Sequence, residues 1–369
     1  MPDPTPNIPG STTPPVDGAA AIALAQETYA RAKAEIAKTI VGQDEVVDQA
    51  LTAIFCRGHA LIVGVPGLAK TLLISTLAKT LSLGFSRIQF TPDLMPSDIT
   101  GTEVIEEDKA TGARELRFVK GPIFANIILA DEINRTPPKT QAALLEAMQE
   151  RQVTIGGVQH HLPDPFFVLA TQNPIEQEGT YPLPEAQLDR FMFQILIEYP
   201  TAAQEAEIVR RSGGVGRVSP QAVLTGPDIR AVHEIIRAMP IADHVLRYAL
   251  RLVRATRIGE PMDSGAERPG MVGEYLAWGA GPRASEYLVL AAKARAALGG
   301  ESFVTPEHVR LAAKPVLRHR ILRNFNAEAD RVSTDMIIDT LVSEIPVEGS
   351  NPEERKQLDR VIGSASSDM

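Results

Sequence analysis

Short apolar runs alternate with helix-length segments between residues 36 and 200. Strand-sized apolar runs separated by helices are typical of parallel sheets, whose strands are buried on both faces. The predicted strands are Ala60–Val63, Arg87–Phe90, Ile127–Ala130, Phe166–Ala170 and Phe191–Ile197. The pattern therefore predicts a parallel α/β sheet in this part of the chain.

Helix signals accompany these strands. A helix is predicted over Lys70–Leu81, directly after a glycine-rich turn. A second is predicted to run from Thr136 through Met148, with Thr136 as its cap and Pro137 at its first position.

Two further segments are predicted to form β-hairpins. One is Thr102–Phe118, with its turn near Lys109–Gly112, and the other is Gln152–Leu162, with its turn at Gly156 and Gly157.

The pattern changes after residue 200. Residues 201–345 carry Ala, Arg, Leu and Val at helical spacing and few strand signals, with a Gly- and Pro-rich loop at Gly259–Gly273. Residues 1–18 are rich in Pro, Gly, Ser and Thr, and residues 346–369 are polar, so both are predicted to be tails. We therefore expect an α/β domain at 19–200 and a helical domain at 201–345.

Composition narrows the class of protein. A chain of 369 residues with 44% hydrophobic residues suits about two globular domains. The net charge of −9 argues against a generic basic surface for nucleic acid. The single cysteine, Cys56, excludes a disulfide framework and is interpreted as a buried residue. No apolar stretch is long enough to span a membrane and the N-terminus lacks a signal-peptide pattern, so we expect a cytoplasmic protein without membrane insertion.

The segment Leu61–Thr71 joins a predicted strand, a glycine-rich turn and a Lys-Thr pair that opens a helix. In phosphate-binding loops, backbone N–H groups surround the phosphates, a lysine neutralises charge and a hydroxyl binds Mg²⁺. Lys70 and Thr71 match the last two roles. The match to G-x-x-x-x-G-K-S/T is incomplete, because Ala69 stands where the second glycine belongs.

Polar residues follow two other predicted strands. Asp131 and Glu132 end the run Ile127–Ala130. Side chains alternate along a strand, so one acid can bind Mg²⁺ while the other orients water; the alternative is a strand that simply reaches solvent. Asn173 follows Phe166–Ala170 at the edge where α/β folds bind ligands, although Asn-Pro is also a common turn signal.

Two arginines lie at helix boundaries. Arg190 separates a short helix from the last strand, and Arg283 lies near a helix start in the second domain. An arginine in such a place can stabilise a transferring phosphoryl group, often from a neighbouring subunit. The alternative for Arg190 is a surface ion pair with Asp189 or Glu185, and for Arg283 a solvated side chain.

A histidine pair and a later basic stretch are both interpreted as surface features rather than as parts of a site. His160 and His161 are adjacent on a strand and point to opposite faces, so they make a poor metal pair and are interpreted as hairpin surface. The basic stretch Leu317–Arg320 is interpreted as a solvated helix face, with a subunit contact as the alternative.

Together these elements resemble the AAA+ ATPases, and more narrowly the MoxR group, over roughly residues 36–345. Gly64–Thr71 reads GVPGLAKT, the form of Walker A that MoxR-type proteins use, so Ala69 is a mark of the family. The other matching segments are Ile40–Gln43, Leu94–Gly101, Ala130–Arg135, Gln172–Pro174, Glu178–Phe191 and Gly281–Arg283.

The resemblance implies ATP and Mg²⁺ as cofactors and a role for each matching residue. Val41 and Gly42 would flank the adenine. The nucleotide-binding loop would comprise Gly64, Val65, Pro66, Gly67, Leu68, Ala69, Lys70, Thr71 and Leu72. The implied Mg²⁺ ligands are Thr71 and Asp131. The implied catalytic residues are Glu132 as the water-polarising base, Asn173 as sensor 1, Arg190 as an arginine finger in trans, and Arg283 as sensor 2, in cis or in trans.

The same resemblance identifies the hairpin at 102–118 as a helix-2 insert and the hairpin at 152–162 as the pre-sensor-1 hairpin. The insert hairpin has five acids against three bases, namely Glu103, Glu106, Glu107, Asp108 and Glu115 against Lys109, Arg114 and Arg117. A hairpin that grips DNA should present bases to the phosphates, so this charge balance argues against nucleic acid.

The family resemblance implies an Mg²⁺-dependent ATPase with a five-stranded parallel core between helices, followed by an all-α lid, that assembles with itself into a ring, a hexamer. Its task would be chaperone-like: maturation, activation or metal insertion for a client protein complex, with a von Willebrand factor A (VWA) domain protein as partner. The alternatives are a magnesium-chelatase-type motor subunit, a nucleic-acid translocase of the same clade, and a nucleotide-gated scaffold without turnover.

Overall fold

The computed structural model describes residues 18–107, 114–175, 179–213, 219–262 and 268–347. Nearly all of both predicted tails lie outside these residues, as do Asp108, the turn predicted near Lys109–Gly112, and Glu178.

Five parallel strands form the central sheet, in the order β2-β5-β8-β1-β9. Their bounds are β1 Ala60–Val63, β2 Phe85–Gln89, β5 Ile127–Asp131, β8 Phe167–Gln172 and β9 Phe193–Leu196. The predicted sheet is confirmed. Because β8 lies between β1 and β5, the carboxyl ends of these three strands meet at one edge.

The sheet separates two hydrophobic cores. Ile127 and Leu129 of β5 face the first core, while Ile128 and Ala130 face the second, as the two-residue period of a strand requires. Helices α1 (Gly18–Ala37), α2 (Asp44–Phe55) and α3 (Lys70–Thr80) border the first core. The second core lies beneath α4 (Pro96–Thr100), the 3₁₀ turn η1 (Ile133–Arg135) and α5 (Pro138–Glu150).

One predicted helix start is wrong. The helix α5 begins at Pro138, and Pro137 rather than Thr136 occupies the N-cap position. The Thr136 hydroxyl instead donates to the carbonyl of Ile133 in η1 (3.4 Å), so it belongs to the preceding turn.

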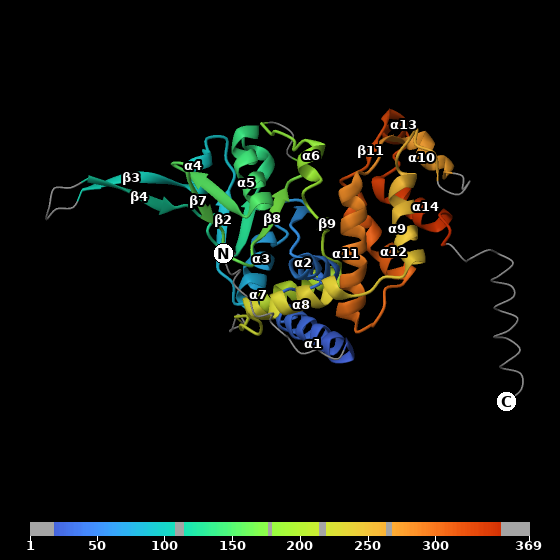
Figure 1. Ribbon diagram of the computed structural model, residues 1–369, viewed down its shortest axis with the longest axis horizontal. Coiled ribbons are helices and arrows are strands. Elements are labelled where there is room, and N and C mark those ends of the chain that lie inside the picture. Colours follow the sequence, from blue (N-terminus) through green and yellow to red (C-terminus); the bar gives the residue numbers. More distant parts are fainter. Residues whose placement is uncertain (1–17, 108–113, 176–178, 214–218, 263–267, 348–369) are drawn as a thin grey trace, which may run out of the picture.

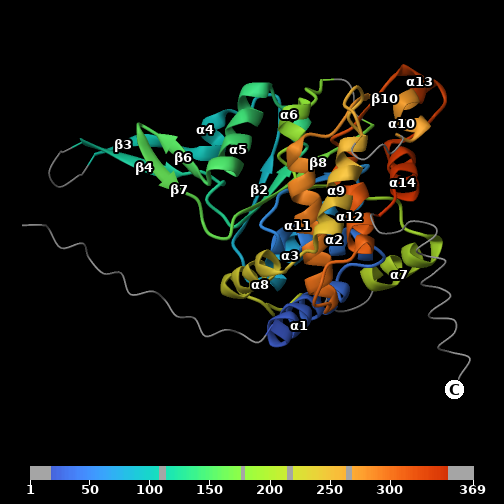
Figure 2. The same ribbon diagram turned by 45° about the vertical axis from the view of Figure 1, so that its right-hand side comes forward.

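Both predicted hairpins are present. The insert hairpin pairs β3 (Gly101–Glu107) with β4 (Arg114–Lys120) and extends away from the body of the molecule (Figures 1 and 2). The pre-sensor hairpin pairs β6 (Gln152–Ile155) with β7 (Val158–His161). Its turn residues Gly156 and Gly157 have φ of +58° and +81°, a left-handed turn that glycine adopts without steric cost.

Helices dominate the chain after β9. The short helix α6 (Glu185–Leu188) precedes β9. The helices that follow β9 are α7 (Ala202–Gly213), α8 (Gly226–Ala238), α9 (Asp243–Ala255), α10 (Gly270–Tyr275), α11 (Pro282–Gly299), α12 (Pro306–Leu317), α13 (Phe325–Ala329) and α14 (Thr334–Glu344). A small antiparallel ribbon, β10 (Leu276–Trp278) with β11 (Leu322–Arg323), was not predicted, because such short strands leave no apolar run to detect. Among the described residues, none of the helices has the length and apolar character needed to cross a bilayer.

The helical domain packs directly on the sheet domain. Helix α11 contacts α1 and α2 (Figure 1). Residues of both domains on this side form one continuous hydrophobic cluster. Cys56 lies inside this cluster, as predicted, and burial raises the pKa of its thiol above the ordinary range.

Candidate active site

The loop between β1 and α3 follows the geometry of an anion-binding turn. A Cβ atom added to Gly64 would lie 2.9 Å from the carbonyl oxygen of Ile197, so only glycine fits there. Gly67 has a φ of +86° and Ala69 a φ of +56°, in the left-handed region. Ala69 is the N-cap of α3, so the free N–H groups of the first helical turn face this loop.

Lys70 lies at the centre of this loop. Its ammonium donates to the carbonyls of Gly64 and Val65, the latter at 3.3 Å. Partial burial lowers the pKa of Lys70, while the carboxylates of Asp131 and Glu132 act in the opposite direction. The lysine of β1–α3 and the acids of β5 therefore belong to one electrostatic environment.

The two acids of the β5 end have separate partners. Asp131 is buried; its Oδ1 accepts a hydrogen bond from the Thr171 hydroxyl (2.7 Å), and its Oδ2 accepts one from Arg87 Nη2 (2.7 Å). Glu132 has a φ of +57°, which turns the chain out of the strand, and its backbone N–H donates to Thr171 Oγ1 (2.9 Å). The predicted divergence of the two carboxylates is thus achieved by a backbone turn as well as by strand alternation.

Glu132 is held by side chains that sequence analysis did not assign. Its Oε2 accepts hydrogen bonds from Gln89 (3.0 Å) and Arg135 (2.9 Å). Gln89 and Arg87 stand two residues apart on β2, the strand next to β5, so both can reach the acids. The signal that could have identified Arg87 and Gln89 is the placement of polar residues at alternate positions on a strand next to one that ends in acids.

Asn173 lies directly after β8, between the ends of β1 and β5. It is buried, and its Oδ1 accepts the N–H of Ile175 (3.1 Å). The amide therefore both closes a turn and lies at the ligand-binding edge, so the two interpretations of this residue are compatible.

Val41 and Gly42 lie before α2, beside the phosphate loop. Gln43 Nε2 donates to the carbonyl of Leu68 (3.2 Å), which joins the two segments. Gly42 has a φ of +73°, and a Cβ atom there would collide with the side chain of Gln204 on α7. Gln204 is a second candidate contact for a bound base that sequence analysis missed.

Arg190 and Arg283 lie near each other, but only Arg283 faces the carboxylate of Asp189. Arg190 Nη1 donates to the carbonyl of Leu145 (2.7 Å), and its Nε is buried with no hydrogen-bond partner among the described residues. Arg283 is the second residue of α11, near the helix start as predicted, and its Nη1 lies 3.9 Å from Asp189 Oδ2. The surface ion pair considered for Arg190 is not formed, since the other oxygen of Asp189 accepts from Arg320 (2.8 Å).

These arginines form a group apart from the loop and the acids. Within the described part of the chain, no hydrogen bond or ion pair joins Arg190 or Arg283 to Lys70, Asp131 or Glu132.

The interpretation of Leu317–Arg320 as a solvated helix face is wrong. The Arg318 and Arg320 side chains are only 8% and 1% exposed, and His319 is buried between them. All three bond to backbone carbonyls of the sheet domain, and the two arginines are also paired with Asp335 and Asp189.

Two family models match the chain: the ATPase family associated with various cellular activities (AAA) over residues 59–193, and the AAA lid domain over residues 270–341. Chaperone MoxR1 of Mycobacterium tuberculosis is 41% identical over 356 residues, which cover 95% of this chain and 91% of the relative. The chain belongs to the MoxR family of AAA+ ATPases.

Other relatives agree with the MoxR assignment. YeaC of Bacillus subtilis is 37% identical over 86% of this chain and 94% of its own length. A crystal structure of an inferred ATPase from Cytophaga hutchinsonii superposes with a TM-score of 0.80 at 42% identity, covering 89% of this chain and 97% of the other. The predicted family and fold are therefore confirmed, and the MoxR-family chain spans nearly the full length of these relatives.

Proposed function

We propose that this MoxR-family protein hydrolyses ATP to ADP and phosphate and uses the reaction for chaperone-like work on a protein client. The observation that carries the proposal is the meeting of Lys70 with Asp131 and Glu132 at the carboxyl ends of β1 and β5. A cation on an anion-binding loop beside two acids with different partners is the arrangement that phosphoryl transfer to water requires.

ATP and Mg²⁺ fit these residues. The loop of residues 64–71 offers N–H groups at the start of α3, and Lys70 is held by carbonyls rather than by a carboxylate, so its charge is available to phosphates. Thr71 and Asp131 would hold the metal, and Val41 and Gly42 would flank the adenine. Bound Mg²⁺ neutralises charge on the phosphates.

The catalytic residues of this chain act on the attacking water and the transferred group. Glu132 accepts a proton from the water and orients it, and the release of its bonds to Gln89 and Arg135 frees its carboxylate for that role. Asn173 donates its amide hydrogens to the water or to a phosphate oxygen.

We further propose that Arg190 and Arg283 both act in trans, on the nucleotide of the next subunit in a hexameric ring. Support comes from the proximity of the two arginines to each other, with Arg283 beside Asp189, the residue before Arg190, and from their separation from Lys70 and the acids of the same chain. An arginine supplied by a neighbour stabilises charge on the transferred phosphoryl group, so hydrolysis would depend on assembly.

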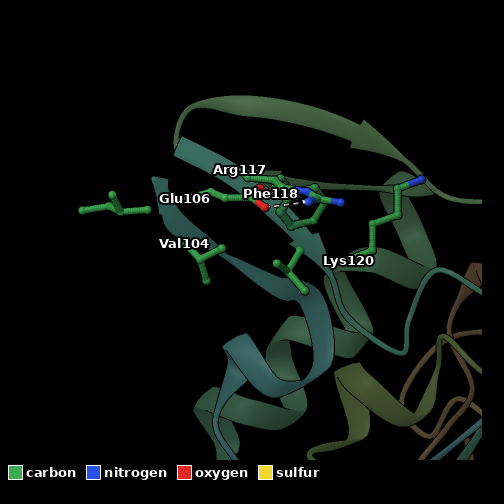
Figure 3. Close-up of a pocket in the computed structure, with 7 residues that line it drawn as sticks. Val104, Glu106, Arg117, Phe118 and Lys120 are labelled. Atoms are coloured by element: carbon green, nitrogen blue, oxygen red, sulfur yellow. Dashed lines mark hydrogen bonds and ion pairs between the residues drawn. The ribbon is translucent and has the colours of Figure 1, made fainter. Parts of the chain in front are cut away.

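The insert hairpin supports a protein client rather than DNA. Ile105 and Leu116 form a cross-strand pair and are 69% and 68% exposed. Both arginines of the hairpin are paired with its own acids: Arg114 lies 3.3 Å from Glu107, and Figure 3 shows Arg117 joined to Glu106 across the strands (2.9 Å). A surface of apolar side chains and internal ion pairs suits a protein better than a phosphate backbone. By family resemblance, the partner is a VWA-domain protein and the work is maturation, activation or metal insertion.

The Glu132→Gln variant tests the proposal most directly. It should bind ATP, fail to hydrolyse it and retain its client, which mass spectrometry of the purified complex would identify. A trapped VWA-domain protein or metalloenzyme would support the chaperone role, whereas trapped DNA, or strong stimulation of wild-type turnover by DNA at physiological salt, would overturn it. A gene neighbourhood of chelatase subunits would favour the motor-subunit alternative.

Lys70→Ala tests the site itself. Turnover should fall to background because the phosphates lose their cation. Retained hydrolysis would refute the assigned loop, and absence of turnover in an assembled wild-type ring would favour the scaffold alternative.

A further inference from the structure

The buried lid segment at residues 318–320 lies between α12 and β11 and contacts the stretch of chain that carries Arg190 into β9. This contact is unusual because buried arginines are costly unless every donor finds an acceptor. The acceptors of Arg320 are concentrated on residues immediately around Arg190.

Arg320 bonds to both sides of Arg190. Its Nε donates to Asp189 Oδ1 (2.8 Å), and its Nη2 donates to the backbone carbonyls of Asp189 (2.9 Å) and Phe191 (2.6 Å). Its Nη1 donates to the carbonyl of Met192 (3.2 Å). One guanidinium therefore fixes three carbonyls in a run of four residues.

Tyr287 of α11 completes this run. The Arg320 guanidinium lies over its ring, 5.1 Å from the centroid, and the Tyr287 hydroxyl donates to the carbonyl of Arg190 (3.3 Å). Every carbonyl from residue 189 to residue 192 is thus bonded to a lid side chain.

The same cluster bears on Arg283. Arg320 engages Asp189 through Oδ1 and leaves Oδ2 toward Arg283, 3.9 Å away. Because Asp189 is fixed by Arg320, the position of Arg283 depends on the same lid residue as the position of Arg190.

We propose that Arg320 is a positioning residue for ATP hydrolysis, which fixes the chain at Arg190 and, through Asp189, the side chain of Arg283, so that both reach the neighbouring subunit's nucleotide. This inference rests on the proposed trans action of the two arginines. It makes the lid of one subunit a determinant of turnover in the next.

The test compares Arg320→Lys with Arg318→Lys. Arg318 is the control, because its side chain is also largely buried (8% exposed) and ion-paired with an aspartate, Asp335 (2.8 Å), but donates to the carbonyl of Gln194, beyond the Arg190 segment. Lysine keeps the charge but cannot reproduce the multiple bonds of a guanidinium. Steady-state ATPase assays would be run on assembled rings, with thermal unfolding and oligomeric state measured in parallel.

We expect Arg320→Lys to lower kcat by about tenfold or more, with KM changed by less than about twofold, and Arg318→Lys to keep kcat within about twofold. In an Arg190→Ala, Arg283→Ala background, Arg320→Lys should cause no further loss of the residual turnover, since a positioning residue acts only through the groups that it positions. Loss of the Tyr287 hydroxyl in Tyr287→Phe, a milder change, should likewise lower kcat only where Arg190 is present.

The outcomes distinguish the positioning role of Arg320 from the trans action of the two arginines, on which it rests. Normal kcat in both Arg320→Lys and Tyr287→Phe, or an equal loss from Arg320→Lys with and without the two arginines Arg190 and Arg283, would overturn the role of Arg320. Normal kcat in Arg190→Ala itself would instead refute the proposed trans action. If Arg320→Lys fails to assemble, the Tyr287→Phe series decides the question alone.

Discussion

Ala69 carries a backbone conformation that glycine adopts more easily. Its φ of +56° brings Cβ close to the backbone, while its side chain is exposed and gains little from packing. Ala69→Gly should therefore raise the free energy of unfolding by about 0.5–1 kcal/mol, after subtraction of the extra entropy of glycine in the unfolded chain. Urea unfolding monitored by circular dichroism measures this change.

Ala78, two residues before the end of α3, the helix that Ala69 caps, is the control. It is buried and helical, so Ala78→Gly should lower the free energy of unfolding by about 1 kcal/mol or more. A loss of stability in both variants would show that the methyl group of Ala69 makes a contact that outweighs its backbone cost.

At the residue scale, sequence predicted the groups whose chemistry is fixed by local order. Lys70, Asp131 and Glu132 follow strand ends, and a strand end fixes where a side chain lies. Arg320 was misjudged because its burial depends on carbonyls more than a hundred residues away in the chain, which no local pattern of charges reveals.

At the scale of secondary-structure elements, the predicted bounds were more accurate for a buried strand than for an exposed one. The central strand β1 matched its predicted bounds because it is apolar throughout. Strand β2 begins earlier than predicted, at Phe85, because it is an edge strand with exposed and polar residues at its start, so its first residues form no apolar run.

The two hairpins are joined by an aromatic contact that neither predicted segment indicated. Phe118 of β4 packs on His160 of β7, with ring centroids 4.2 Å apart, and also meets the edge of Phe124 (5.6 Å). His160 is therefore a packing residue between hairpins rather than plain surface.

Phe118→Ala should loosen both hairpins together. Removal of the ring deletes the contact to His160, so amide hydrogen exchange should accelerate in β3, β4, β6 and β7 while the central sheet keeps its protection. Val119→Ala, an exposed change on the opposite face of the same strand, is the control and should leave β6 and β7 unaffected. Exchange in β6 and β7 that is equal for the two variants would show that the hairpins move independently.

At the scale of the whole molecule, the proposed site is divided into two groups. One group comprises the loop and the acids, and the other comprises Arg190 and, beside Asp189, Arg283. The sequence suggested the residues of both groups, but it left open whether Arg283 acts on the nucleotide of its own subunit or on that of the next. The answer depends on where the lid lies relative to the sheet, which is a tertiary property.

Mixed rings test this division. Lys70→Ala subunits lack a working loop but carry both arginines, whereas Arg190→Ala subunits have the loop but lack the finger. Each variant alone should keep no more than a small residual turnover, and co-assembled rings should recover a substantial part of wild-type turnover, because a loop from one variant then meets the arginines of the other. ATPase activity across mixing ratios, at constant total subunit concentration, measures the recovery.

A second mixture decides how Arg283 acts. If both arginines act in trans, every interface in a ring of Arg190→Ala and Arg283→Ala subunits lacks one of them, and mixing should restore nothing. If Arg283 acts within its own chain, the nucleotide of an Arg190→Ala subunit would still have its own Arg283 and would receive Arg190 from its neighbour, so turnover would return. The position of Asp189 makes the first result the expected one, because its carboxylate lies 3.9 Å from Arg283 and Asp189 directly precedes Arg190 in the chain.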